Sequence, residues 1–344
     1  MYKTKLHKTY NWAIKAGILL LAYYVIYKQV FAKESWTGIH EHFSENYSLW
    51  GVLLPGFTVV VLMLFNWGTE SLKWQYLIRK NENISLFTSV KGVFSGVTIS
   101  AMTPNRMGEY FGRIFVLKKT HPVRGILMTI VGSISQLLAT VVVGGCVLIF
   151  VLIKYPEPFF VDNFVLQITS LLGVLLVMAV LGGIYFNIHQ VSEILRRLAK
   201  KRPKINSFLK VFSYYSKKEL LNIFMLSLLR YMIFSGQFFI LMRLFNLNFS
   251  LLDSLCIIAL IFLGITVIPS VALAALPIRG TISFFVVDIF ASINTGGGAL
   301  NAGFEFDILA ASSMLWLINI VIPALMGSVF ILTLSFFKDK NDVG

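Results

Sequence analysis

The sequence predicts an all-α protein, a helical bundle that crosses a lipid membrane several times, and three observations predict it. Hydrophobic residues make up 57% of the 344 residues and charged residues only 13%, about half of the roughly 25% that is typical of a soluble globular domain. Several apolar stretches reach the length of about 20 residues that a transmembrane helix needs. The charged segments between these stretches differ in sign, as the positive-inside rule requires.

Seven apolar stretches are long enough to cross a bilayer. They are residues 13–31, 47–69, 126–153, 164–186, 220–242, 254–278 and 308–337. The first follows three lysines and could also be a signal peptide. We interpret it as an uncleaved helix, because cleavage would invert the charge bias of the remaining loops. We therefore expect seven or eight spans in a single integral domain, residues 1–344.

The loops between the stretches predict the orientation. Segment 33–45 has one lysine against three acidic residues, whereas segment 106–124 has five basic residues against Glu109. The joining segment 187–219 is the most basic, with nine Lys and Arg between residues 192 and 218 against Glu193. We expect this loop and both termini to face the cytoplasm of an inner or plasma membrane. This distribution accounts for the net charge of +14, so we expect no nucleic-acid partner.

Two apolar segments are too short to span, and they resemble each other. Segment 92–105 has fourteen residues and segment 281–293 has thirteen, with Asp288 inside it, which is the length of a re-entrant arm or half-helix. Phe94, Gly96, Thr98 and Pro104 have counterparts in Phe262, Gly264, Thr266 and either Pro269 or Pro277. Interrupted segments at matching places suggest a transporter built from internal repeats, here about 1–153 and 164–337. Chance similarity between common membrane residues is the alternative.

The stretch TPNRMGEYFGR, residues 103–113, brings three charges to the end of the first short segment. Pro104 should end the apolar arm, and a helix that starts after it would direct its free N–H groups toward the membrane. Arg106 would add a planar set of donors suited to phosphate or carboxylate. Glu109 and Arg113, four residues apart, can pair on one helix face. The segment therefore predicts an anion site, with ordinary loop charges as the alternative.

Two further arginines are candidates for the same site. Arg230 lies near the middle of the 220–242 stretch, where an arginine costs about 2.5–3.5 kcal/mol on insertion scales and needs a partner or a wet cavity. Its structural alternative is a pair with Asp288 or Glu70. Arg279 follows Pro277, as Arg106 follows Pro104. Three uncharged polar residues within apolar stretches are expected to be interhelical hydrogen-bond partners: Gln136, Gln237 and Asn319.

The motif Thr-Pro-x-Arg-x-Gly-Glu resembles that of a membrane family, the flippase-like proteins related to the transmembrane region of lysylphosphatidylglycerol synthetases. Thr103, Pro104, Arg106, Gly108 and Glu109 match this first motif, while Asn105 stands where Gly is usual. The second motif matches loosely at Pro269 and at Pro277 to Gly280, where Gly280 replaces the usual Glu. The resemblance implies movement of charged lipids between leaflets. The loss of the second Glu favours an anionic phospholipid or polyprenyl phosphate over an aminoacylated lipid.

These observations lead to one interpretation with two alternatives. We expect a flippase for an anionic lipid or lipid-linked phosphate carrier; a membrane-embedded transferase and a non-catalytic assembly subunit are the alternatives. No Walker loop, dinucleotide fingerprint or hydrolase motif is present, and Cys146 and Cys256 lack partners for a disulfide or metal site. We expect no cofactor, no metal and membrane lipids as partners. Seven residues follow Phe337, so we expect no appended aminoacyl-transfer domain and no lysyl transfer.

The candidate residues fall into two groups. The expected substrate-binding residues are Thr103, Arg106, Glu109, Arg113, Arg230 and Arg279. The residues expected to shape the broken helices are Pro104, Gly108, Pro269, Pro277 and Gly280.

Overall fold

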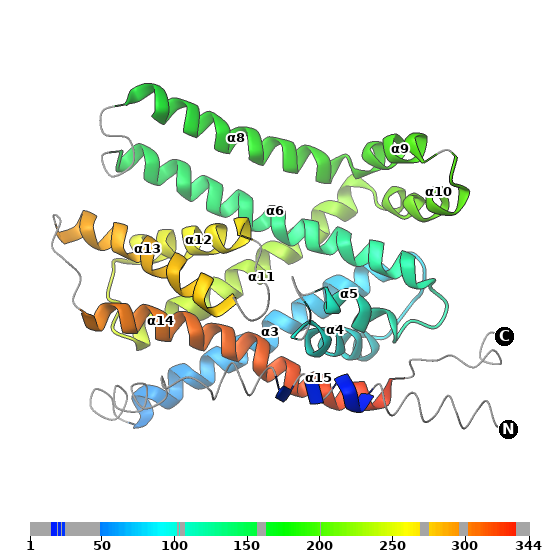
Figure 1. Cartoon of the computed structure of the whole chain (residues 1–344), viewed down its shortest axis with the longest axis horizontal. Coiled ribbons are helices and arrows are strands. Elements are labelled where there is room, and N and C mark those ends of the chain that lie inside the picture. Colours follow the sequence, from blue (N-terminus) through cyan, green and yellow to red (C-terminus); the bar gives the residue numbers. More distant parts are fainter. Residues whose placement is uncertain are drawn as a thin grey trace.

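The structure, a computed structural model, consists of helices and connecting turns, and no strand occurs in the part of the chain that it describes. It describes residues 15–18, 20–21, 23–24, 49–101, 103, 107–156, 163–199, 201–268, 275–295 and 302–334. Beyond the short helical pieces at residues 15–24, the elements are α3 (Leu49–Ile78), α4 (Leu86–Ser100), α5 (Gly108–Ile114), α6 (Pro122–Lys154), α8 (Phe164–Phe186), α9 (Ile188–Leu198), α10 (Pro203–Leu209), the 3-10 helix η2 (Lys210–Tyr214), α11 (Lys217–Leu244), α12 (Leu251–Val267), α13 (Ala275–Thr295), α14 (Ala302–Trp316), the π-helix η4 (Leu317–Val321) and α15 (Ile322–Thr333). The expected all-helical bundle is confirmed (Figure 1).

Five of the described helices are long and apolar enough to cross a membrane. They are α3, α6, α8, α11 and the continuous helical segment Phe306–Thr333. Each contains or overlaps one of the expected spans, and α8 has the expected bounds, 164–186. The expected span 13–31 lies mostly outside the described residues. The chain is therefore a multi-pass membrane protein.

The expected end of the span 47–69 is wrong. Helix α3 continues for nine residues beyond Thr69, as far as Ile78. Glu70 and Lys73 follow the apolar stretch directly, and charged residues usually mark the start of a loop. In the structure both side chains are buried in ion pairs within the bundle, so their charges do not end the helix.

The expected continuous span 254–278 is also wrong. Helix α12 ends at Val267, and Ile268 has extended backbone angles, φ −96° and ψ 109°. Ile268 precedes Pro269, and the ring of a proline disfavours helical angles in the residue before it. Pro277 does not end a helix either, because α13 begins at Ala275 and has 21 residues. The short segment 281–293 is thus the larger part of α13. Proline is tolerated in a first helical turn, where its missing N–H has no partner to lose.

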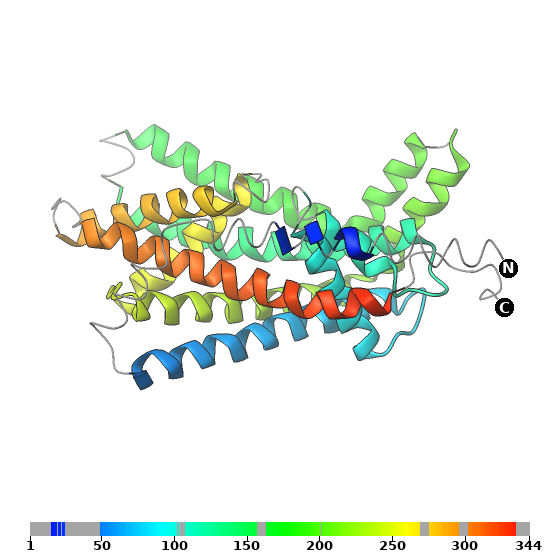
Figure 2. The same ribbon diagram turned by 60° about the horizontal axis from the view of Figure 1, so that its bottom comes forward.

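Helices α4 and α5 pack against each other as a helical hairpin. The carboxylate of Glu82, before α4, accepts hydrogen bonds from the backbone N–H groups of Lys118, Lys119 and Thr120, after α5, at 2.9, 2.8 and 2.9 Å. The chain therefore enters and leaves this hairpin at the same end of the bundle. Helices α12 and α13 also pack against each other, and Figures 1 and 2 place them toward the opposite end of the long helices.

The basic segment 187–219 is helical rather than a loop. Helices α9 and α10 and the 3-10 helix η2 fill most of it. The phenol of Tyr215 donates to the carbonyl oxygen of Leu77, at 3.0 Å, near the end of α3. This contact fixes the segment to the bundle on the side where α6 begins (Figure 2).

Candidate functional site

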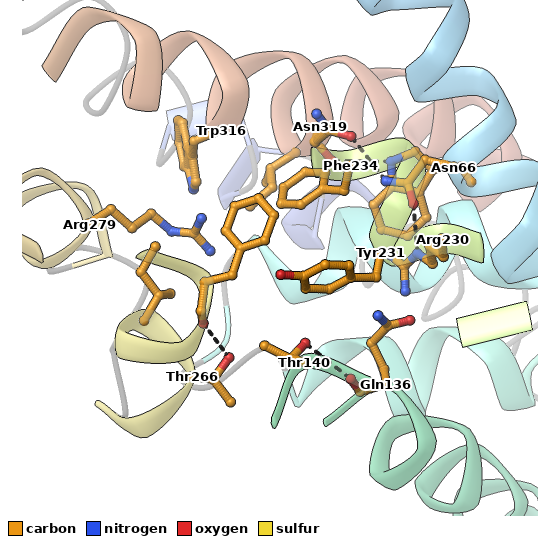
Figure 3. Close-up of a pocket in the computed structure, with 14 residues that line it drawn as sticks. Asn66, Gln136, Thr140, Arg230, Tyr231, Phe234, Thr266, Arg279, Trp316 and Asn319 are labelled. Carbon is orange, nitrogen blue, oxygen red and sulfur yellow. Dashed lines mark hydrogen bonds between the residues drawn. The ribbon is translucent and has the colours of Figure 1, made fainter. Parts of the chain in front are cut away.

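A cavity of about 240 Å³ lies among the helices at the middle of α11. Its lining comes from α3, α6, α11, α12, α13 and the C-terminal helical segment (Figure 3). The polar and aromatic residues labelled there are Asn66, Gln136, Thr140, Arg230, Tyr231, Phe234, Thr266, Arg279, Trp316 and Asn319. Among the described residues, the lining contains two arginines and no acidic residue. We call it the arginine cavity.

A second cavity of about 280 Å³ adjoins the first, because the two share Gln136, Thr140, Arg230 and Thr266. We call it the side cavity. Glu70, Lys73 and Glu109 line it together with Tyr110 and Ser133. Arg230 therefore lies between the arginine cavity, whose described lining is free of carboxylates, and the side cavity, which is lined by the carboxylates of Glu70 and Glu109.

Pro323 explains the π-helix that borders the arginine cavity. A proline has no N–H and cannot donate to the carbonyl four residues earlier, here that of Asn319. The helix widens over Leu317–Val321, where Ile322 donates to the carbonyl of Leu317, five residues back. The indole N–H of Trp67 donates to the freed carbonyl of Asn319 at 3.2 Å. A π-bulge inside a membrane helix commonly marks a functional position.

The guanidinium group of Arg230 has hydrogen-bond partners along its edge and an aromatic ring against its face. Its Nε donates to Oδ1 of Asn66 at 2.9 Å, and one terminal nitrogen donates to Glu70 at 2.8 Å. The guanidinium carbon lies 5.0 Å from the ring centroid of Trp67, a cation–π distance. The sequence suggested an ion pair of Arg230 with Asp288 or Glu70, and the pair with Glu70 is present in the structure.

Glu70 is the centre of a buried charge cluster. Its carboxylate contacts Lys73, Arg113 and Arg230, each at 2.8 Å. Arg113 also pairs with Glu109 at 3.2 Å, four residues earlier on the same helix, as the spacing predicts. We call these five residues the Glu70 cluster. Three cations against two carboxylates leave a formal excess of one positive charge beside the arginine cavity.

Lys73 is a site residue that the sequence analysis missed. Its side chain is buried, and its ammonium contacts Glu70 and lies 3.3 Å from the hydroxyl of Ser227 and 3.5 Å from the side-chain oxygen of Gln136. The available signal was the spacing of Glu70 and Lys73, which places an ion pair on one helix face next to an apolar run.

The structure describes part of the Thr-Pro-x-Arg motif. The hydroxyl of Thr103 accepts from the N–H of Gly108 at 2.7 Å and lies 3.4 Å from the carbonyl of Ser100, so it closes the turn before α5. A β-carbon on Gly108 would overlap the backbone of Ile99, and glycine therefore permits this close approach. Pro104, Arg106 and Pro269 lie outside the described residues.

The other candidates take different places. Arg279, on the second turn of α13, reaches into the arginine cavity from the side opposite Arg230 (Figure 3). Glu109 lines the side cavity, whereas Arg113 is buried between Glu70 and Glu109. Gly280 is buried, and a β-carbon there would overlap the side chain of Leu309. The backbone of Pro277 lies in the first turn of α13.

The three uncharged polar residues connect helices, as expected. Gln237 donates to the carbonyl of Val59 at 2.8 Å, and the side-chain oxygen of Asn319 accepts from Asn66 at 3.1 Å. Gln136 donates to the carbonyl of Ser227 at 3.3 Å, and it also lines both cavities. Within the described ranges, no group of three His, Cys, Asp or Glu side chains could hold a metal ion.

The fold and the site define a class: a multi-pass helical membrane protein with a cationic cavity enclosed between interrupted helices. The chain belongs to the lysylphosphatidylglycerol synthase TM region family, whose model matches residues 12–276. Membership places it among membrane domains associated with lipid handling. The matched range includes α3 to α12 and ends three residues before Arg279. Searches of curated proteins and of solved structures gave no match.

Proposed function

We propose that this protein moves an anionic lipid, either a phospholipid or a lipid-linked phosphate carrier, between the leaflets of the membrane. One observation carries the proposal: Arg230 and Arg279 line one cavity within the bundle, and none of the described residues that line it is acidic. Arginines at membrane depth are costly to keep and commonly mark the pathway of a substrate or ion. A phosphate headgroup in the cavity would accept charge-assisted hydrogen bonds from the two guanidinium groups.

The Glu70 cluster supports the choice of an anion. Glu70 is 4% exposed and already contacts three cations. A cationic headgroup would be repelled by the formal excess of one positive charge of this cluster and by the guanidinium group of Arg279, whereas a phosphate would be attracted by both. Gly280, in place of the Glu that is usual in the resembling motif, also leaves no acidic partner for a lysyl group at that position.

In the mechanism that we propose, the headgroup enters the arginine cavity while the hydrocarbon tail remains in the lipid. Arg279 and Arg230 bind the phosphate oxygens, and the amide of Asn66 and the carboxylate of Glu70 hold Arg230 in place. Glu109 faces the side cavity and orients Arg113. Movement is downhill or ion-coupled. The protein would lie in an inner or plasma membrane, with the basic ends of its helices and both termini in the cytoplasm.

The test is leaflet exchange by purified protein in proteoliposomes. A fluorescent phosphatidylglycerol is placed in the inner leaflet, and its appearance outside is followed with a membrane-impermeant quencher. Wild type should exchange the lipid, and Arg279→Gln should exchange it much more slowly. Arg243→Gln is the matched control, because Arg243 lies at the far end of α11 and contacts Asn248 and Phe249 outside the cavity.

The same vesicles separate the alternatives. Conversion of the lipid, detected by mass spectrometry, would favour the membrane-embedded transferase. Arg230→Gln and Arg279→Gln variants that insert, stay folded and support growth of the native host like wild type would favour the assembly subunit. Either outcome would contradict the flippase proposal.

A further inference from the structure

The hairpin of α9 and α10 consists of two short helices in the basic segment 187–219, unlike the long apolar helices of the bundle. Ser192 on α9 donates to the carbonyl of Leu209 at 2.9 Å, and Arg196 donates to the side chain of Asn206 at 2.7 Å. These contacts fix the two helices to each other. The ring of Phe208 lies 4.9 Å from that of His121, beside the start of α6. The segment is therefore a folded element with a defined outer face.

The position of the hairpin follows from the length of α8. This helix has 23 residues, about 34 Å at 1.5 Å per residue, which is enough to cross a hydrocarbon core of about 30 Å. Tyr185 is its only buried residue within the described chain, so α8 faces lipid. Helix α9 begins two residues after α8 ends, at the boundary of the bilayer.

The outer face of α9 is divided into an apolar and a polar part. Ile194 and Leu198, one turn apart, are 59% and 79% exposed, and Leu195 beside them is also exposed. Glu193 and Arg197 are exposed on the polar side of the same helix. A segment surrounded only by water would gain no stability from directing two leucines and an isoleucine outward. A helix that lies in the membrane surface has this pattern.

The charge around these apolar residues is positive. The exposed basic residues from α9 to the start of η2 are Arg197, Lys201, Arg202, Lys204 and Lys210. Ile205 on α10 is exposed among them. Membrane topology requires basic residues near the ends of spans but no exposed leucines. Basic and apolar residues on one folded surface favour a bilayer with anionic headgroups.

We propose that the α9–α10 hairpin is a membrane-surface element that binds the anionic lipids of the leaflet at the end of α8. Ile194, Leu195 and Leu198 enter the boundary between headgroups and acyl chains. The neighbouring lysines and arginines contact the anionic headgroups. This inference is independent of lipid movement through the arginine cavity.

The test measures the depth of single positions in the full-length protein reconstituted into nanodiscs. Cys146, which is exposed, is replaced by serine, and an environment-sensitive fluorophore is attached at Leu198→Cys. Glu193→Cys, on the polar side of the same helix, is the matched control. Each is measured in phosphatidylcholine alone and with phosphatidylglycerol added, using iodide as the water-soluble quencher and brominated lipid as the membrane quencher.

The expected result is specific to position and lipid. The label at 198 should be quenched by brominated lipid and protected from iodide, more strongly with phosphatidylglycerol present, whereas the label at 193 should be open to iodide throughout. The charge reversal Arg197→Glu with Arg202→Glu should remove the phosphatidylglycerol dependence. Iodide access at 198 in both bilayers would overturn the proposal. Protection that arises only after addition of host cytosolic protein would overturn it too and would indicate a protein partner.

Discussion

The α4–α5 hairpin and the α12–α13 hairpin both interrupt the series of long helices, and they differ in what surrounds their charged residues. In the first, Arg113 is buried between two carboxylates, and Glu82 ties the two ends of the hairpin together. In the second, Arg279 lines an open cavity of about 240 Å³. The difference teaches that the first hairpin is a rigid support for the Glu70 cluster, while the second places an arginine at the cavity that we propose binds the ligand.

The largest effect should come from removing Glu70, the anion on α3 that binds Arg113 of the first hairpin. Glu70→Gln leaves Lys73, Arg113 and Arg230 without their common partner, and breaking a buried ion pair costs about 3–5 kcal/mol. The variant should unfold at a markedly lower temperature in detergent. Glu219→Gln is the control, because Glu219 pairs with Lys80 and Arg79 at the surface, where a pair contributes about 0–1 kcal/mol. Equal thermal stabilities of the two variants would refute the supporting role.

The next effect should be on transport and should separate the two arginines. A hydrogen bond to a charged group contributes about 1.5–3 kcal/mol, so Arg279→Gln should slow exchange of an anionic lipid about 10- to 100-fold with little change in thermal stability. Arg113→Gln should mainly lower the unfolding temperature. Exchange and unfolding are measured on the same preparations. A loss of stability in Arg279→Gln as large as in Arg113→Gln would remove the contrast between the hairpins.

A smaller difference in stability between the two hairpins should come from the close packing of their helices at glycine residues. A β-carbon on Gly112 would overlap the backbone of Gly96 in the first hairpin, whereas one on Gly264 would meet a side-chain methyl of Ile282, at 2.9 Å, in the second. Backbone cannot move aside as a side chain can, so Gly112→Ala should cost about 1–3 kcal/mol and Gly264→Ala much less. Thermal unfolding of both variants measures this. A larger loss in Gly264→Ala would reverse the assignment of the rigid hairpin.

The smallest effect should be the pH dependence of folding stability that comes from Glu82, which joins the two ends of the first hairpin. Burial opposes ionisation of Glu82, but the backbone N–H groups of Lys118, Lys119 and Thr120 outweigh it and hold its pKa below the ordinary value. Because the pKa is lower in the folded state, Glu82 contributes stability above its unfolded pKa, and that contribution is lost as the pH falls through the folded value. Glu82→Gln should therefore be less stable than wild type at neutral pH, with the difference shrinking in acid. A difference that is constant with pH would contradict this.

The apolar pattern predicted the long helices because lipid exposure is a local property of the sequence. Helix α8 has its expected bounds because no charged residue and no proline interrupts it. The span that contains most of α3 was expected to end at Thr69, because Lys73 is the one partner of Glu70 in this cluster that lies near it in the sequence. Its partners Arg113 and Arg230 are 43 and 160 residues away, so the Glu70 cluster becomes visible only in the fold.

The candidate site could be predicted only where a residue is unusual for its own stretch of sequence. An arginine in the middle of a span is anomalous in any sequence, and Arg230 was therefore identified as a candidate. Arg279 was found through its position after a proline, and both line the arginine cavity. Lys73 and the π-helix around Asn319 were missed, because the first looks like a loop charge and the second depends on Pro323 removing a donor. The apolar face of α9 was missed because nine basic residues made segment 187–219 look like a loop.

The most direct test of the central claim is the preference for headgroup charge. Exchange rates of fluorescent phosphatidylglycerol and of its lysyl ester are compared in proteoliposomes containing wild type, Arg279→Gln or Arg243→Gln. The account predicts that wild type and Arg243→Gln exchange the anionic lipid faster, and that Arg279→Gln loses most of this preference. Equal rates for both lipids in wild type, or an unchanged preference in Arg279→Gln, would contradict it.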